Sequence, residues 1–357
     1  MIPAFFTALV AVFLAFLSRN EKKHSYLLLL AFVVLTTFLS LGYYWGNDVG
    51  RYEERFEYYN NSGIALFDFS QYGLLALKEM GYVFINILCR PLGFWGMRAL
   101  LFVVENAIIF YFIVKHVDRK WYWLAVFVYV YNPNFWVLSS SMMRQWLAIC
   151  IIVLSVDFLL RRKYLTFSLL VVLASTIHVS SFVCMVFLPI AMFNKGTSRN
   201  SIATFFVVLL SYYILSPFFI SYLADFLTEE DFYMGYTSRQ GSVGIAAVGH
   251  MLIYIYLFYV SVRTKQNDIL LNRIVLLYGF VLPLLSFGEL SARIGFYFTI
   301  FTIAVYPMFM NNKAGNPLLK RTVVFVACAY LLYLYYIFFN GQTYHEAYWN
   351  YRMLPSF

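Results

Sequence analysis

The chain has 357 residues, of which 62% are apolar and 21% aromatic, while only 12% are charged. Long apolar runs, rather than amphipathic stripes, dominate the pattern, so we predict an all-α polytopic membrane protein. A net charge of +9 would suggest a nucleic-acid partner in a soluble protein. We expect no such partner here, because in a membrane protein the distribution of basic residues matters more than their sum.

The apolar runs predict about twelve transmembrane helices, each of roughly 15–21 residues and therefore close to the thickness of a bilayer. The runs lie at residues 2–17, 26–45, 98–115, 121–138, 143–160, 164–178, 180–194, 201–219, 244–262, 271–287, 291–311 and 322–340. The two short runs beside His178 could instead form a hairpin that does not cross. We treat 1–357 as one integral membrane domain with outer loops at about 46–97 and 220–243.

The basic residues are unevenly distributed between the two predicted sides. One set of alternate connections holds 17 of the 26 lysines and arginines, which makes that side cytoplasmic and places both termini outside. Eight of the other nine basic residues are arginines. Because the guanidinium fork suits phosphate or carboxylate, we expect an anion site on the outer side.

The first outer loop begins with a stretch of helical spacing. On a helix, Asp48, Arg51, Tyr52, Arg55 and Tyr59 would share one face. This face predicts a ligand-binding surface, with an exposed helix carrying weak salt bridges as the alternative.

Residues 73–90 are less apolar than the spans, because Lys78, Glu79, Tyr82 and Asn86 would line one side. A spanning helix here would invert all later loops, so we predict an amphipathic or re-entrant outer helix. The alternative is a surface anchor whose polar side meets lipid headgroups.

Two polar stretches interrupt the apolar pattern further along the chain. Arg144 follows three serines, 139–141, at the outer start of a span, where serine caps and helix N–H groups favour an anion. An arginine that snorkels to headgroups is the alternative. His178 lies beside Ser180 and is either a catalytic base or a packed, hydrogen-bonded residue.

Other chemistries lack their sequence marks. The four cysteines show no metal-ligand spacing, and the chain has no phosphate-binding P-loop, no serine nucleophile elbow and no His-Glu-x-x-His zinc motif. We therefore expect neither a metal nor a cofactor. The acidic, glycine-containing loop at 220–243 is a candidate lid.

Several marks form an ordered set between about residues 40 and 310. They are Asn47-Asp48 with Tyr52 and Phe56, Glu79-x-Gly81-Tyr82, Met143-Arg144-Gln145-x-x-Ala148, Ala174-x-x-x-His178-x-Ser180, and Arg293 with Tyr297. This set resembles the EpsG-like family of bacterial polysaccharide polymerases, the counterparts of Wzy.

The resemblance implies a membrane fold of the glycosyltransferase-C type and a multi-pass protein of the bacterial cytoplasmic membrane. Its active site would face the periplasm or cell exterior. There it would transfer a glycan from undecaprenyl diphosphate to the non-reducing end of a second lipid-linked repeat unit. The product would be an exopolysaccharide, capsule or O-antigen. Membrane lipid and a chain-length regulator protein are further candidate partners.

We expect three groups of site residues for this chemistry. The candidates are Arg144, Arg293, Arg51 and Arg55 for the donor diphosphate; His178, Glu79 and Asp48 for catalysis; and Tyr82, Gln145 and Tyr297 for the acceptor. Inversion and retention at the anomeric carbon both stay open. So do two alternative functions, an O-antigen-ligase-like transferase and a flippase or exporter of lipid-linked oligosaccharide.

Overall fold

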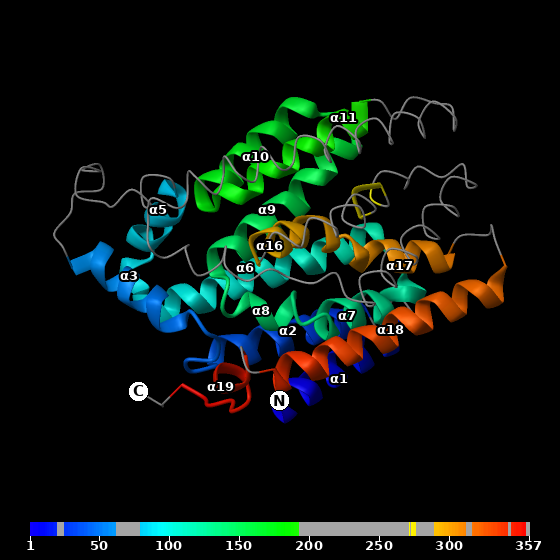
Figure 1. Ribbon diagram of the computed structural model, residues 1–357, viewed down its shortest axis with the longest axis horizontal. Coiled ribbons are helices and arrows are strands. Elements are labelled where there is room, and N and C mark those ends of the chain that lie inside the picture. Colours follow the sequence, from blue (N-terminus) through cyan, green and yellow to red (C-terminus); the bar gives the residue numbers. More distant parts are fainter. Residues whose placement is uncertain are drawn as a thin grey trace.

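The computed structural model describes residues 1–19, 25–61, 79–192, 271, 273–275, 289–311, 316–341 and 344–354. Its α-helices are α1 (Ile2–Leu17), α2 (Ser25–Leu41), α3 (Val49–Asn61), α5 (Met80–Leu88), α6 (Gly93–His116), α7 (Tyr122–Tyr131), α8 (Trp136–Ser139), α9 (Met143–Leu160), α10 (Tyr164–Ile177), α11 (Phe187–Met192), α16 (Glu289–Thr299), α17 (Thr302–Asn311), α18 (Pro317–Asn340) and α19 (His345–Tyr348). Three 3-10 helices are η3 (Arg90–Leu92), η4 (Arg119–Trp121) and η5 (Val179–Val186). Figure 1 shows the longer helices packed side by side as a bundle.

The prediction of an all-α membrane protein is confirmed for the described part of the chain. Four helical stretches there are long and apolar enough to cross a membrane, at Arg90–His116, Met143–Leu160, Arg293–Asn311 and Pro317–Asn340, and shorter apolar helices accompany them. The runs predicted at 201–219 and 244–262, most of 271–287 and the candidate lid at 220–243 lie outside the described residues.

One predicted span is broken rather than continuous, and the chain also breaks between the two short runs predicted beside His178. The run at 121–138 forms α7, which ends at Tyr131, and the short α8. Pro133 lies in the break, where it lacks the N–H that a continuing helix needs. The runs around His178 form α10, η5 and α11, with His178 in an extended conformation between the first two. Both breaks lead the chain towards the same polar site.

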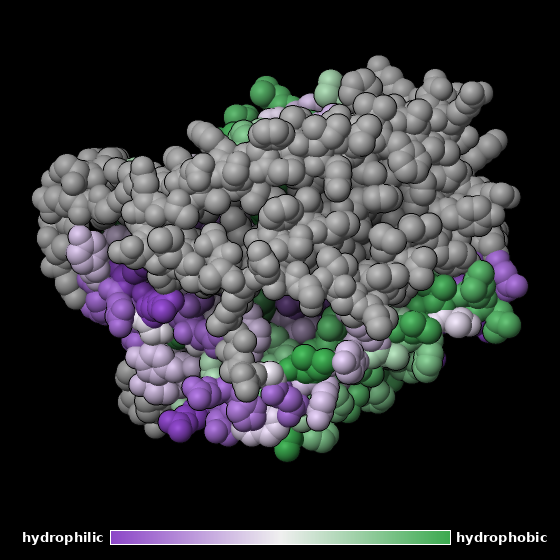
Figure 2. Space-filling view, viewed as in Figure 1, coloured by the Kyte–Doolittle hydropathy of each residue, from purple (hydrophilic) through white to green (hydrophobic). Residues whose placement is uncertain are grey.

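Small residues on α1 allow close packing in the bundle. Ala4, Ala8, Ala11 and Ala15 are at most 1% exposed and form one stripe, which lets α1 approach α2 and α7 closely. Large apolar side chains such as Phe6 occupy the opposite face and are exposed, as expected for contact with lipid. Figure 2 shows hydrophobic residues gathered over α18 and α1, while hydrophilic residues gather at the α3 end.

The two ends of the chain meet at one end of the bundle. The Met1 amino group donates to the Trp349 carbonyl at 2.6 Å. The segment after α19 pairs with the residues after α2 through an isolated antiparallel bridge between Gly42 and Met353, and Tyr43 N–H donates to the Arg352 carbonyl at 2.8 Å. This pairing fixes the chain just before α3. The start of the chain and the described C-terminal segment therefore lie together.

Candidate functional site

Glu79 is the centre of a buried charged cluster formed by three separate elements. Its Oε2 accepts a hydrogen bond from Arg144 Nη1, and its Oε1 lies 2.7 Å from His178 Nδ1. Glu79 immediately precedes α5, Arg144 is in the first turn of α9, and His178 joins α10 to η5. The side chains of all three are less than a fifth exposed. The structure thus brings together one diphosphate-binding candidate and two catalytic candidates.

A close helix contact positions this cluster. Gly81 lies so near the end of α10 that a Cβ atom there would overlap Thr176 Oγ1 and come within 3.1 Å of Ile177 Cγ1. Only glycine fits this approach without a shift, because it has no Cβ. The contact brings Glu79, two residues before Gly81, next to His178, one residue after Ile177. Gly81 therefore explains how residues 99 positions apart meet.

The polar side of α5 faces the protein and not lipid headgroups. Tyr82 is 2% exposed and Asn86 is fully buried, whereas Phe84 and Leu88 are more than half exposed. The alternative of a surface anchor with its polar side towards headgroups is therefore wrong for the described residues, 80–88. The reason is that the polar side packs against α3 and α10. Lys78 and the earlier part of 73–90 lie outside the described residues.

The electrostatics of the cluster favour an ionised Glu79. Burial by itself would raise the pKa of Glu79. The charge of Arg144, the charge of His178 in its protonated form, and the hydrogen bonds from both outweigh burial and lower this pKa to about 2. The rings of Tyr52 and Tyr82 lie 5.6 and 6.0 Å from the Arg144 guanidinium carbon, which is cation–π distance. The Arg144 guanidinium is therefore held inside the protein. The alternative, in which it snorkels to lipid headgroups, does not describe its position.

The serines before α9 have a different role from the predicted one. Ser139, Ser140 and Ser141 are at most 2% exposed, and no side chain caps the start of α9. Ser139 and Ser140 donate to backbone carbonyls three residues earlier, at 2.8 Å each. The expected serine cap for an anion is therefore wrong, because these hydroxyls are engaged within their own turn. The turn instead holds α3, since the Asp48 N–H donates to Ser141 Oγ at 3.1 Å.

Helix α16 supplies two further contacts beside the charged cluster. Gln145, the neighbour of Arg144, donates to the Arg293 carbonyl at 2.7 Å. Tyr297 is fully buried, and its hydroxyl is 3.2 Å from Ser180 Oγ. The predicted residues Gln145, Arg293 and Tyr297 thus tie α16 to α9 and to η5 on either side of the site.

The residues predicted to share one face of α3 do not all lie in the same environment. Tyr52 is buried against the Arg144 cluster, whereas the Arg51 side chain is 59% exposed and lies 3.6 Å from the Asp48 carboxylate. Asp48 is joined to the site through the serine turn rather than through Glu79. Arg55 is half-buried and interacts electrostatically with Tyr59.

Two aromatic residues at this end were not among the predicted site residues. Tyr59 lies in the electrostatic field of Arg144 and Glu79, and burial raises its pKa. Tyr348, in α19, is fully buried, and its hydroxyl lies 3.4 Å from Ser140 Oγ. The helical spacing of α3 had marked Tyr59. No pattern in the sequence marked Tyr348, because its partner is 208 positions away.

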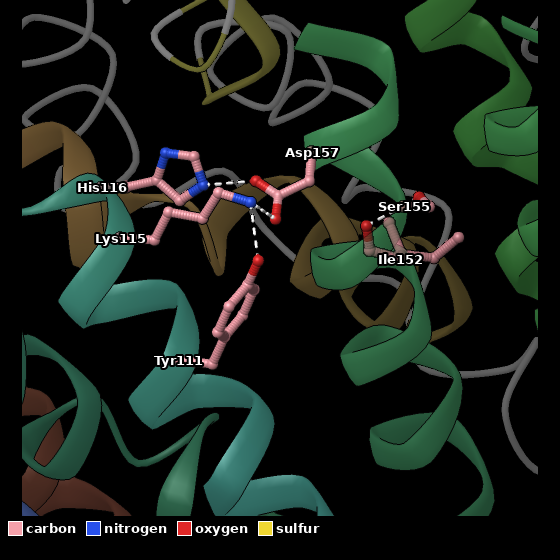
Figure 3. Close-up of polar contacts among 6 residues, drawn as sticks. All are labelled: Tyr111, Lys115, His116, Ile152, Ser155 and Asp157. Carbon is pink, nitrogen blue, oxygen red and sulfur yellow. Dashed lines mark hydrogen bonds and ion pairs between the residues drawn. The ribbon is translucent and has the colours of Figure 1, made fainter. Parts of the chain in front are cut away.

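A second polar cluster lies at the opposite end of α9 (Figure 3). Asp157 accepts a hydrogen bond from Lys115 and lies 2.6 Å from His116 Nε2. Lys115 also donates to the Tyr111 hydroxyl at 2.7 Å. These contacts join the ends of α6 and α9, which run parallel. The sequence patterns marked neither His116 nor its carboxylate partner Asp157 as a candidate site residue.

Among the described residues, no group of three or more histidines, cysteines or acidic residues is arranged to hold a metal ion. The Glu79 cluster can hold an anion next to an imidazole. Arginine only donates hydrogen bonds and therefore suits an anion, and the imidazole can accept and release a proton.

The fold and the site define an all-helical membrane protein with a buried Glu–Arg–His cluster at one end of its bundle. The sequence model of the EpsG family matches residues 25–353, and the chain belongs to this family. Membership supports a polymerase-like role in polysaccharide biosynthesis and confirms the resemblance seen in the sequence. No curated protein and no solved structure matches the chain.

Proposed function

We propose that the protein is a polysaccharide polymerase that transfers a glycan from undecaprenyl diphosphate to the non-reducing end of a second lipid-linked repeat unit. The observation that carries the proposal is the Glu79 carboxylate bound to both Arg144 and His178 in a member of the EpsG family. The reaction needs an anion holder and a proton acceptor close together. This cluster provides one of each.

His178 is the proposed base. Because a carboxylate only accepts hydrogen bonds, Glu79 favours the tautomer whose proton is on Nδ1, 2.7 Å from Oε1. Nε2 is then the ring nitrogen with a lone pair. It takes the proton of the acceptor hydroxyl as that oxygen bonds to the anomeric carbon. Glu79 is a positioning residue in this scheme and not the base, since its ion pair with Arg144 keeps it ionised and weakly basic.

Arg144 is the proposed holder of the leaving group. As the bond from the anomeric carbon to the diphosphate oxygen breaks, undecaprenyl diphosphate leaves with the bonding electrons and gains negative charge. A guanidinium offers five N–H donors, so Arg144 can bind Glu79 with one edge and the diphosphate with another. Each such charge-assisted hydrogen bond is worth about 1.5–3 kcal/mol.

The other candidate arginines lie on elements that contact this centre. Arg293 is linked to it through the Gln145 contact, and Arg51 and Arg55 lie on α3, the helix that carries Tyr52. We assign these three arginines to secondary diphosphate contacts. Tyr82, Gln145 and Tyr297, which the sequence assigned to the acceptor, are buried. We therefore assign them to holding the elements of the site together.

The decisive experiment supplies purified protein in lipid nanodiscs with one lipid-linked repeat unit and no other protein. A polymerase produces a ladder of glycan lengths by itself. A flippase produces no ladder, and a ligase requires a different acceptor. If the wild-type protein, reconstituted in closed liposomes, moves the repeat unit across the bilayer without lengthening it, the polymerase proposal is wrong.

Two variants then test the roles of the residues. We expect His178→Ala to slow lengthening about 10²- to 10⁴-fold, the usual contribution of a general base, while lipid-linked donor still binds. Arg144→Lys keeps the charge but loses the fork, so we expect weaker donor binding and a lower rate. Arg352→Lys, at an exposed arginine of the C-terminal segment, is the matched control. Wild-type lengthening by His178→Ala would refute the base assignment.

A further inference from the structure

A cluster of aromatic side chains lies beside the site at the same end of the bundle. Tyr43, Tyr44 and Trp95 form it, with ring centroids 4.6 Å apart for the two tyrosines and 5.2 and 5.3 Å from each tyrosine to Trp95. Tyr44 is 44% exposed, and the other two are partly exposed. We call these three residues the aromatic platform. Its rings come from the connection after α2 and from the first turn of α6.

The backbone at Tyr44 is held in an unfavourable conformation. Its φ is +46°, in the left-handed region that residues with a Cβ rarely adopt. Such strain persists only where surrounding structure imposes it, and it is concentrated at functional sites. The restraint here is the C-terminal segment, because the Tyr43 N–H donates to the Arg352 carbonyl at 2.8 Å. The exposed ring is therefore placed by the fold and is not simply a loose side chain.

Carboxylates border the platform on one side. The Tyr44 hydroxyl donates to Glu53 Oε2, and this hydrogen bond, with burial and nearby acidic groups, raises the pKa of Tyr44 to about 12. Glu54 is exposed and acts electrostatically on the same tyrosine. Exposed aromatic rings beside hydrogen-bond acceptor oxygens are suited to bind a pyranose ring. Its C–H faces pack on aromatic rings, and its hydroxyls donate to carboxylates.

The platform is connected to the charged cluster through packed side chains. Trp95 packs against the apolar cluster that contains Tyr52 and Tyr82, the two rings beside Arg144. Glu53 directly follows Tyr52 on α3. One of these neighbouring residues contacts the platform through Tyr44, and the other lies beside Arg144 in the charged cluster. Helix α3 therefore lies next to both the charged cluster and the platform.

We infer that Tyr44 and Trp95, with Glu53 and Glu54, form a subsite for a pyranose ring of the glycan substrate, one or more sugars away from the reacting bond. The inference rests on the proposed function and names where that substrate is held. The shared chemistry is a neutral sugar ring, which either the donor glycan or the acceptor glycan can supply. A tyrosine and tryptophan anchor at the membrane interface, with no sugar contact, is the outcome that would overturn it.

The test measures binding of a free oligosaccharide, the repeat unit hydrolysed from the host strain's own polysaccharide, to the purified protein in nanodiscs. Tyr44→Asn removes the ring with a residue that tolerates positive φ, and Tyr44→Phe keeps the ring without the hydroxyl. We expect roughly threefold to tenfold weaker binding for Tyr44→Asn and a smaller loss for Tyr44→Phe. Tyr26→Asn, at another exposed tyrosine, at the other end of α2, is the control.

The outcomes separate the subsite from the polymerase proposal. Equal oligosaccharide binding by wild type, Tyr44→Asn and Tyr26→Asn would overturn the subsite, even if a glycan ladder still forms. Binding that requires Tyr44 without any ladder would support the subsite and refute the polymerase. Raising the concentrations of donor and acceptor separately in the ladder assay shows which glycan occupies the subsite. The one whose KM rises in Tyr44→Asn is its ligand.

Discussion

His178 and Glu79 are 99 positions apart in the chain, yet the imidazole Nδ1 lies 2.7 Å from the carboxylate Oε1. The same carboxylate binds Arg144 with its other oxygen. One acidic residue therefore sets the tautomer of a histidine and balances the charge of a buried arginine. Four predictions test this arrangement and its surroundings.

Replacing Glu79 with glutamine should strongly destabilise the protein, because the Arg144 guanidinium would lose its buried counter-ion. Removing one partner of such a pair costs about 3–5 kcal/mol. Apparent Tm in nanodiscs measures the effect, and glycan lengthening should fall with it. Glu346→Gln, at an exposed position in α19, should leave both apparent Tm and lengthening unchanged. A Glu79→Gln protein as stable as wild type would show that the ion pair is absent.

Stability should depend on acid pH through Glu79. Its pKa is lowered from 4.5 to about 2 in the folded protein, so its contribution is complete above about pH 4.5. The contribution, roughly 3 kcal/mol, is lost progressively as the pH falls from 4.5 towards 2. Comparing the pH dependence of apparent Tm in wild type and Glu79→Gln isolates this carboxylate. Identical slopes for the two proteins below pH 4.5 would contradict the assignment.

Adding a methyl group at Gly81 should separate α5 from α10. Overpacking of this kind costs about 1–3 kcal/mol, and the shift would move Glu79 away from His178. We expect Gly81→Ala to lower both apparent Tm and the lengthening rate. Thr176→Ala removes the oxygen that the new Cβ overlaps, so the double variant should recover part of both. If the double variant behaves like Gly81→Ala alone, the overlap with Thr176 is not the cause.

The Asp157 cluster should affect stability without affecting the chemistry. Asp157→Asn weakens the bonds to Lys115 and His116, at a cost of roughly 1–3 kcal/mol. Asp157 is about 20 Å along α9 from Arg144, so the folded variant should lengthen glycans at the wild-type rate. Apparent Tm and a ladder assay at low temperature together check this. A slower lengthening rate for an Asp157→Asn protein that is fully folded would contradict this prediction and connect this end of α9 to catalysis.

The sequence alone determined the class of protein and several of its helices. Apolar length is a local property, so the runs at 2–17 and 143–160 coincide with α1 and α9. The ordered motifs pointed to the EpsG family, which the match over residues 25–353 confirms. They also marked Glu79, Arg144 and His178 as separate candidates.

Only the tertiary structure decided what these residues do to one another. A helical pattern shows which face a side chain occupies but not which distant element that face meets. The sequence offered Glu79 as a candidate base. The close approach of Gly81 to α10 places the Glu79 carboxylate against His178 and Arg144. The serines before α9 were expected to cap an anion site. They are instead buried, because α19 and the start of α3, two distant segments of the chain, pack against them.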